Sequence, residues 1–377
     1  MNKVTYLTYQ SFPNQKANSI QTIRMLENLT ANNVKVRLFY PSRDKNYQKE
    51  ESLVSFYNIL HNFEIFELPH KLPFNYFNYF QKITFVFSSF VWSLNAVRKV
   101  MKNTASEEVM MTRTHWVLLF LSKYKNLIIF ECHKYSKINN FIFKILKTKK
   151  NVIIIFTNEI LKNTFKLSKG LKDHSIILPS SYEERFFKSI DISSNKKNNR
   201  VVFVGHLLRF NKSRDIEFLI KAFSDNDLKD YELRIIGGPK EIEEKLKKNL
   251  SENIKILGHL SNKDAIKEME SAEIGILLNE KNQHSELHTS PIKYFEYIRA
   301  NLKVLAIDFD SHHQLPITEN IYFFEKNNIE SFKKNLFFVS KKEFRFNPKI
   351  LEYSYGQRVI KLINHIARLE GLEPPTL

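Results

Sequence analysis

The chain has 377 residues, of which 43% are hydrophobic and 13% aromatic, so it is too long for one small core and fits two domains. Its one cysteine, Cys132, excludes an intrachain disulfide and favours a reducing compartment. Lysine and arginine outnumber aspartate and glutamate by 58 to 40, and the formal charge of +18 favours anionic partners.

The first segments read as a strand, a helix and a second strand. Residues 4–9 have strand composition and no apolar core of a signal peptide, so we do not expect export. Apolar residues from Ile20 to Leu29 keep helical spacing, and residues 34–40 form the next strand. This order predicts a βαβ unit with parallel strands, whose loop at residues 15–19 would face a ligand cleft.

Residues 69–102 form the most apolar long stretch of the chain. Apolar side chains recur there every three or four positions, which predicts a helix, although the stretch is too short and too rich in Ser and Thr to span a bilayer. Two interpretations stay open. The helix either packs in a core, or it lies on an anionic membrane through aromatic residues such as Phe85 and Trp92, between flanking basic residues.

Three continuous apolar runs follow, as expected for strands that are buried on both faces: 109–113, 127–131 and 152–157. Because the carboxyl ends of parallel strands meet at one edge of a sheet, polar residues at these ends should converge. They include Arg113, Glu131 and His133. A histidine after a strand is usually a polar loop residue, so this pattern alone does not decide between a loop role and a functional role for His133.

The second half of the chain repeats this organisation. Residues 189–199 are polar and lack periodicity, which predicts an interdomain linker. Further strands are expected at 201–205, 232–238, 254–258, 272–279 and 303–308. We therefore predict an α/β protein with two Rossmann-like doubly wound domains. The expected segments are an N-terminal domain at 1–188, a C-terminal domain at 200–350, an amphipathic helix at 351–370 and a tail at 371–377.

The stretch from Ser290 to Ala300 predicts a helix with Ser290 as its N-cap and Pro291 in its first turn. A helix N-terminus is a ready anion site. Glu296 lies about one and a half turns inside, within reach of a sugar attached to a phosphate at the helix start. This spacing suits a nucleotide, although an ordinary amphipathic helix is the alternative.

The order Ser290-Pro291-x-Lys-x-Phe-Glu296-Tyr, then a small residue, a turn and a Val/Leu-rich strand, resembles the nucleotide-sugar signature of retaining glycosyltransferases with the GT-B fold (group 1, family 4-like). The resemblance implies two Rossmann-like domains facing a cleft and a C-terminal helix that crosses back. It further implies that Ser290, Pro291 and Ile292 contact the donor diphosphate and that Glu296 bonds the ribose. The family's second Glu, eight positions earlier, is replaced by His288.

The resemblance also covers two loops. After the first strand of the second domain the family usually shows Gly-Arg-Leu, a spacer and Lys-Gly, which bind the diphosphate. Here Gly205 is kept, His206 replaces the Arg, and Lys212 is displaced. Lys212 is the expected diphosphate ligand and Arg209 the alternative, against a merely solvated basic loop. In the first domain, His133 matches a position near the acceptor that organises the reacting groups.

Asp308-Phe309-Asp310 follows a strand and mimics the Asp-x-Asp metal site of another glycosyltransferase fold. The resembled family simply ends a strand with Asp at this point of the chain. We therefore expect no metal ion and no cofactor, the nucleotide-diphosphate sugar being a substrate.

The resemblance implies a transferase that moves a sugar, hexosyl or related, from a nucleotide-diphosphate sugar to a glycan or lipid-linked acceptor, in surface polysaccharide or glycoconjugate synthesis. His133, Lys212 and Glu296 are its expected catalytic residues. Two alternatives stay open: a nucleotide-sugar hydrolase or epimerase of the same fold, and a non-catalytic basic adaptor. No nucleic-acid-binding signature accompanies the charge, so no nucleic acid partner is expected. The expected location is cytoplasmic, with peripheral attachment to an anionic membrane surface, the inner face of the plasma membrane, as an open alternative.

Overall fold

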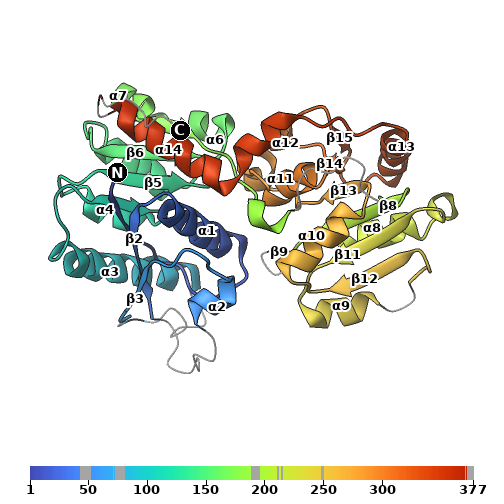
Figure 1. Ribbon diagram of the computed structural model, residues 1–377, viewed down its shortest axis with the longest axis horizontal. Coiled ribbons are helices and arrows are strands. Elements are labelled where there is room, and N and C mark those ends of the chain that lie inside the picture. Colours follow the sequence, from blue (N-terminus) through green and yellow to red (C-terminus); the bar gives the residue numbers. More distant parts are fainter. Residues whose placement is uncertain are drawn as a thin grey trace. The chain divides into compact units, whose positions relative to one another are not determined.

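The computed structural model describes residues 1–42, 52–70, 72, 81–187, 196–209, 212–213, 215–247, 250–369 and 371. The chain divides into unit 1, Met1–Leu178 with Tyr355–Leu377, and unit 2, Pro179–Ser354. Each unit has a parallel sheet covered by helices, which confirms the predicted α/β class with two Rossmann-like units (Figure 1). The division falls after Leu178 instead of in the expected linker at 189–199, of which residues 189–195 lie outside the described residues.

Unit 1 contains a seven-stranded sheet in the order β3-β2-β1-β4-β5-β6-β7, with parallel neighbours. The strands are β1 (Lys3–Leu7), β2 (Lys35–Pro41), β3 (Glu64–Leu68), β4 (Val109–Thr112), β5 (Ile128–Cys132), β6 (Val152–Phe156) and β7 (Ser175–Ile177). β5 and β6 are buried along their whole length, as their apolar sequence predicts. The strand order reverses between β1 and β4, and in open α/β sheets ligands bind beyond the carboxyl ends at such a point.

Helices cover both faces of this sheet. One face carries α3 (Gln81–Met101), α4 (His115–Leu121), α5 (Lys137–Ile145), α6 (Glu159–Thr164) and α7 (Lys169–Asp173). The other carries α1 (Ala17–Ala31), α2 (Leu53–Tyr57) and α14 (Tyr355–Leu369). Val359, Leu362 and Ile366 of α14 share a core cluster with Ile23 and Leu26 of α1, so the C-terminal helix belongs to unit 1.

Helix α3 occupies most of the apolar stretch at 69–102. Trp92 is only 3% exposed and packs in the core, contrary to the interpretation that places it on a membrane. Ile83 and Phe87, in the first two turns, are 68% and 60% exposed. Residues 73–80 lie outside the described residues. Among the helices that the structure describes, none is long and apolar enough to cross a membrane.

Unit 2 repeats this plan with a six-stranded sheet in the order β12-β11-β8-β13-β14-β15, again with parallel neighbours. The strands are β8 (Arg200–Val204), β11 (Glu232–Ile236), β12 (Ile254–Gly258), β13 (Ile274–Leu277), β14 (Lys303–Ile307) and β15 (Ile321–Phe324). The helices are α8 (Ile216–Phe223), α9 (Lys240–Leu246), α10 (Asn262–Glu270), α11 (Ile292–Arg299), α12 (Asp310–His313) and α13 (Ile329–Ser340). The strand order reverses between β8 and β13, beside α11.

Two connecting segments of unit 2 run side by side. The Tyr182 amide donates to the Tyr353 carbonyl at 3.1 Å, and Tyr182 forms a parallel bridge with Ser354. Arg299, at the end of α11, pairs with Glu184 at 2.7 Å, so the segment after Leu178 is anchored to that helix. The chain therefore enters and leaves unit 2 next to α11.

Close packing holds α11 against the sheet. A Cβ atom added to Gly275 of β13 would lie 2.6 Å from the Tyr297 ring, so only glycine leaves room for the ring. The Tyr297 hydroxyl accepts a hydrogen bond from the Val204 amide at 2.9 Å and lies 3.4 Å from the Ile276 carbonyl. One side chain thus joins α11 to the ends of β8 and β13.

We predict that Gly275→Ala destabilises the protein by about 1–3 kcal/mol, because the added methyl group would overpack the contact with Tyr297. Urea unfolding monitored by circular dichroism measures the change. Gly170→Ala is the control, since its Cβ would have only the Lys147 carbonyl oxygen nearby, at 4.0 Å. Equal stability of the two variants would contradict the packing argument.

Candidate functional site

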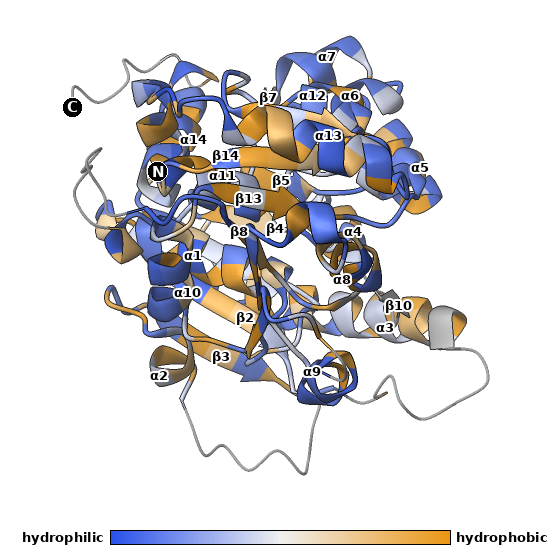
Figure 2. Ribbon diagram, turned by 90° about the vertical axis from the view of Figure 1, so that its right-hand side faces the viewer, coloured by the Kyte–Doolittle hydropathy of each residue, from blue (hydrophilic) through white to orange (hydrophobic). Residues whose placement is uncertain are grey.

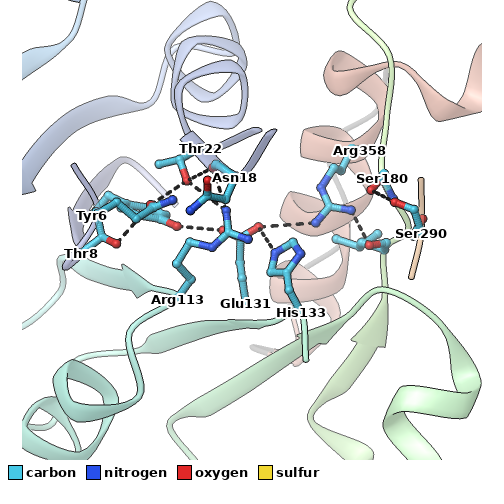
Figure 3. A network of polar contacts seen from close by, with 12 residues as sticks. Tyr6, Thr8, Asn18, Thr22, Arg113, Glu131, His133, Ser180, Ser290 and Arg358 are labelled. Atoms are coloured by element: carbon cyan, nitrogen blue, oxygen red, sulfur yellow. Dashed lines mark hydrogen bonds and ion pairs between the residues drawn. The ribbon is translucent and has the colours of Figure 1, made fainter. Parts of the chain in front are cut away.

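A buried carboxylate, Glu131, lies at the end of β5 in unit 1 (Figure 3). The Tyr6 hydroxyl donates to Glu131 Oε2 at 2.9 Å. Arg358 Nη2 lies 3.4 Å and His133 Nε2 3.9 Å from Glu131 Oε1. Burial by itself would raise the pKa of the Glu131 carboxyl, but His133, Arg113 and Arg358 hold that pKa well below its ordinary value. The carboxylate is therefore ionised at neutral pH and orients the groups around it.

His133 is a neutral imidazole at neutral pH. Burial lowers its pKa to about 4, and the positive charge of Arg113 acts in the same direction, while Glu131 opposes both. The side chain is still 22% exposed. His133 can therefore exchange a hydrogen bond with a hydroxyl group of a ligand, but it offers no positive charge to a phosphate.

Arg113 joins the end of β4 to the start of α1. Its Nη1 donates to the Asn18 carbonyl at 2.8 Å and to Thr22 Oγ1 at 3.3 Å. Thr22 and Thr8 in turn donate to Gln10 Oε1, at 3.0 Å and 3.1 Å. The ends of β1, β4 and β5 thus meet at the point where the strand order reverses, as the pattern of polar strand ends predicts.

Two residues that contact Glu131, Tyr6 and Arg358, are absent from the site predicted from the sequence. In the sequence, nothing distinguishes Tyr6 from the other residues of a Thr/Tyr-rich strand. Arg358 is a charge within the otherwise apolar face of α14, next to Val359, and it is only 5% exposed. A charge on the buried face of a helix needs a partner, and this signal could have found Arg358.

In unit 2 backbone hydrogen bonds join the loops that follow β8 and β11. The Gly205 amide donates to the Ile236 carbonyl at 2.9 Å, and the Leu207 amide donates to the Gly238 carbonyl at 2.8 Å. Gly237 has a φ of 144°, and a Cβ there would lie 1.8 Å from the Gly205 carbonyl oxygen. This contact fixes the backbone at Gly205, while the next residue, His206, is exposed at the same edge of the sheet.

The basic part of the β8 loop forms a short hairpin. β9 (Leu208–Arg209) pairs antiparallel with β10 (Lys212–Ser213). The side chains of Arg209 and Lys212 lie outside the described part of the structure. Their roles as diphosphate ligands therefore stay predictions.

Helix α11 begins at Ile292 with Pro291 as its N-cap, so the prediction of Ser290 as N-cap is wrong. The Ser290 hydroxyl instead accepts a hydrogen bond from the Ser180 amide at 2.9 Å, and the Ser180 hydroxyl donates to the Ser290 carbonyl at 2.5 Å. Since Pro291 has no hydroxyl or amide side chain, it does not cap the amides of the first turn. Ser290 thus holds the segment at Ser180 next to the helix start.

Glu296 lies on the accessible side of α11. Its neighbours Phe295 and Tyr297 are fully buried, whereas the Glu296 side chain is 17% exposed. It forms an ion pair with Lys293, one turn earlier on the same helix. A positive and a negative group therefore follow the amides at the helix start, beside the end of β8.

His288 is buried and ends the π-helix η4 (His284–His288), just before α11. Burial lowers its pKa, so it is neutral at neutral pH. It therefore cannot replace the negative charge of a carboxylate at this position.

Asp308 follows β14, and its Oδ1 lies 2.6 Å from His313 Nε2. Asp310 begins α12. No cluster of three His, Cys, Asp or Glu side chains suited to a metal ion occurs among the described residues. The absence of a metal requirement stays a prediction.

The second unit matches a known family. Residues 198–339 match the family model described as Glycosyl transferases group 1. No curated protein sequence matches the chain.

Solved structures share the fold over nearly the whole chain. A glycosyltransferase from Rickettsia africae ESF-5 has a TM-score of 0.69 and 13% identity, covering 98% of this chain and 99% of that one. WaaG, a glycosyltransferase involved in lipopolysaccharide biosynthesis, has a TM-score of 0.58 and 14% identity over 94% of each chain. A trehalose-6-phosphate structure from E. coli bound with UDP-2-fluoro glucose has a TM-score of 0.65 and 10% identity, covering 99% of this chain and 100% of that one. At such identities the likeness is one of fold, and it confirms the predicted GT-B architecture.

We predict that acidification from pH 6.5 to pH 4 destabilises the wild type more than His133→Asn. The unfolded histidine takes up a proton near pH 6.5, whereas folded His133 stays neutral down to about pH 4, so stability is lost as the pH falls through this window. The difference between the two proteins should reach roughly 1–3 kcal/mol. Urea unfolding across the pH range measures it.

The exposed His259 supplies the control, and His259→Asn should follow the wild type at every pH. An identical pH dependence of the wild type and His133→Asn would show that His133 is not held neutral by its surroundings.

Proposed function

Since residues 198–339 match the model of glycosyl transferases group 1 and the two units together have the GT-B fold, we propose that this chain is a retaining glycosyltransferase that uses a nucleotide-diphosphate sugar as donor. Unit 2 would bind the donor and unit 1 the acceptor. The proposal rests above all on the start of α11, where amide groups, Lys293 and Glu296 follow one another at the carboxyl edge of the sheet.

The donor would bind with its diphosphate at the first turn of α11. The partial positive charge of a helix start attracts the diphosphate, and Lys293, which is paired with Glu296 in this structure, adds a second positive group. Glu296 lies about one turn deeper and can accept hydrogen bonds from ribose hydroxyls. Gly205 and His206 lie at the same sheet edge, with Lys212 as the expected cation of the neighbouring hairpin and Arg209 as its alternative.

The acceptor would bind at the Glu131 cluster of unit 1. Neutral His133 is suited to position an acceptor hydroxyl, and ionised Glu131 lies 3.9 Å from its Nε2. Catalysis would then come from aligning that hydroxyl and from neutralising charge on the leaving diphosphate. Neither role needs a metal ion.

The acceptor class is a glycan or a lipid-linked sugar, and the setting is surface polysaccharide or glycoconjugate synthesis in the cytoplasm. The fold shared with WaaG, a glycosyltransferase involved in lipopolysaccharide biosynthesis, supports this class. The lone buried cysteine, Cys132, suits a reducing compartment. Hexosyl transfer is the specific form that we propose.

Nucleotide release from labelled donors, measured with and without a glycan acceptor, tests the proposal. A transferase releases nucleotide faster when acceptor is present, and nuclear magnetic resonance of the product shows whether the anomeric configuration is retained. Nucleotide release at the same rate with and without acceptor would identify a hydrolase. If no donor is bound and no nucleotide is released, the result would favour a non-catalytic adaptor.

We predict that Glu296→Ala weakens nucleotide binding by about 1.5–3 kcal/mol, because hydrogen bonds to a charged carboxylate are lost. A thermal-shift screen with uridine, guanosine, cytidine and adenosine diphosphates first identifies the base. A ligand at a hundred times its dissociation constant stabilises by about 2.7 kcal/mol. Glu244→Ala, which removes an exposed carboxylate from α9, should bind as the wild type does. Unchanged affinity in folded Glu296→Ala would rule out the ribose contact.

We also predict that transfer activity survives EDTA, because the helix start, Lys293 and Lys212 supply the positive charge at the diphosphate. Activity is compared before and after chelation, and again after addition of Mg²⁺ or Mn²⁺. Activity that disappears with EDTA and returns with either ion would instead make Asp308 and Asp310 candidate ligands.

A further inference from the structure

Three neighbouring helices cover part of one face of unit 1. Helices α3, α4 and α5 bury their inner sides in the same core cluster, and α4 packs against both of its neighbours. Their outward side chains define a surface that we call the α3–α5 face. The α3–α5 face comprises only the described residues of these helices and the lysines that directly follow α5.

The α3–α5 face exposes large apolar side chains. Phe141 and Ile145 of α5 are 59% and 47% exposed, although Ile142 and Phe143 between them are buried. Ile83 and Phe87 of α3 are exposed to a similar or greater extent. Figure 2 shows hydrophilic and hydrophobic residues together on α5. Helical spacing places both apolar residues of α5 on its outer side, so they contribute nothing to the core.

Lysines accompany the two apolar residues of α5, and acidic residues are scarce in the sequence of both helices. The segment between Glu67 and Glu107, which contains α3, has no Asp or Glu. Between Glu108 and Glu159 the single acidic residue is the buried Glu131. Six lysines follow it: Lys134, Lys137, Lys144, Lys147, Lys149 and Lys150. None of the six forms an ion pair within the described ranges, so their charge faces solvent uncompensated.

Basic charge continues beside the end of α5. The Ser168 hydroxyl donates to the Lys147 carbonyl at 2.9 Å, which brings the start of α7 next to this end. Lys166 and Lys169 flank Ser168 and are exposed. The positive surface therefore extends from α5 to the neighbouring connection.

We propose that the α3–α5 face docks on a lipid bilayer that contains anionic lipids. Lysines would lie at the negatively charged headgroups, and Phe141, Ile145, Ile83 and Phe87 would enter the boundary with the acyl chains. A nucleic acid would satisfy the lysines but would leave two exposed isoleucines in water. The combination of uncompensated lysines with aliphatic and aromatic side chains therefore favours a membrane.

The α3–α5 face is adjacent to the candidate acceptor site. His133 leads through three residues into α5, whose N-cap is Ser136. On the other side, the Phe85 ring of α3 lies 5.4 Å from the ring of Tyr9, which follows β1. A docked protein would thus present this edge of its sheet near the headgroups. Delivery of a lipid-linked acceptor to His133 rests on the proposed function, whereas membrane binding itself does not.

Vesicle co-sedimentation tests the docking surface with the full-length protein. Vesicles of phosphatidylcholine alone are compared with vesicles that also contain phosphatidylglycerol, at low and at high salt. We expect binding to the anionic vesicles and a decrease with salt, because the attraction is screened within a Debye length. Failure of the wild type to bind anionic vesicles at low salt would overturn the proposal.

Matched variants locate the surface. Since each lysine near an anionic surface contributes about a fivefold gain in partitioning, Lys137→Glu/Lys144→Glu/Lys147→Glu should lower binding by roughly 100-fold or more. Phe141→Ser/Ile145→Ser should lower it by roughly 10-fold or more. Lys245→Glu/Lys247→Glu/Lys263→Glu makes the same charge change at exposed positions of unit 2, and Phe338→Ser/Leu351→Ser makes a comparable apolar change there. Both controls should bind much as the wild type does.

Two results would contradict this location. Equal losses in the α5 and unit 2 lysine variants would mean that only net charge matters. Tighter binding to a mixed-sequence RNA than to vesicles, unaffected by Phe141→Ser/Ile145→Ser, would identify a nucleic-acid surface. Circular dichroism and thermal unfolding confirm that each variant is folded. Nucleotide release with a soluble acceptor is measured in parallel, so a failure of docking is distinguished from a failure of the proposed transferase activity.

Discussion

An ionised carboxylate buried at the end of β5 needs positive and hydrogen-bonding partners, and unit 1 supplies them from separate parts of the chain. Glu131 receives a hydrogen bond from Tyr6 of β1 and faces Arg358 of α14 and His133 beyond β5. A buried charge without such partners costs several kcal/mol. The last helix therefore contributes to the site as well as to the core, since Arg358 also donates to the Leu178 carbonyl, where the chain leaves the unit.

In unit 2 the candidate site is held by close packing, whereas in unit 1 it is held by charged groups. Gly275 lets the Tyr297 ring approach β13, and Gly237 lets the loop after β11 touch Gly205. Both contacts fix elements that end at the same edge of the sheet. The start of α11 and the backbone at Gly205 are thus held by rigid neighbours, which a site for a charged, multi-part ligand requires.

Basic residues have two different surroundings in this protein. Lys303 is buried and satisfied by Glu273 and by the Lys342 carbonyl, each at 2.6 Å. The lysines of α5 are exposed and have no carboxylate partner in the described part of the chain. Lys303 therefore supports the fold of unit 2, whereas the α5 lysines form an uncompensated surface on unit 1. Net charge alone could not separate these roles.

The sequence by itself determined the α/β class, the repeated two-unit plan and the helix that carries Glu296, because these depend on local periodicity, continuous apolar strands and a short motif. It also placed Arg113, Glu131 and His133 at neighbouring strand ends, since parallel strands put their carboxyl ends at one edge. Only the tertiary structure decided that Arg358 lies against Glu131, although 227 positions separate them in the chain. It also decided that the Ser290 hydroxyl bonds Ser180 instead of capping α11, and that Trp92 is buried while Phe87 is exposed. Such contacts depend on how distant segments pack, and no local pattern encodes them.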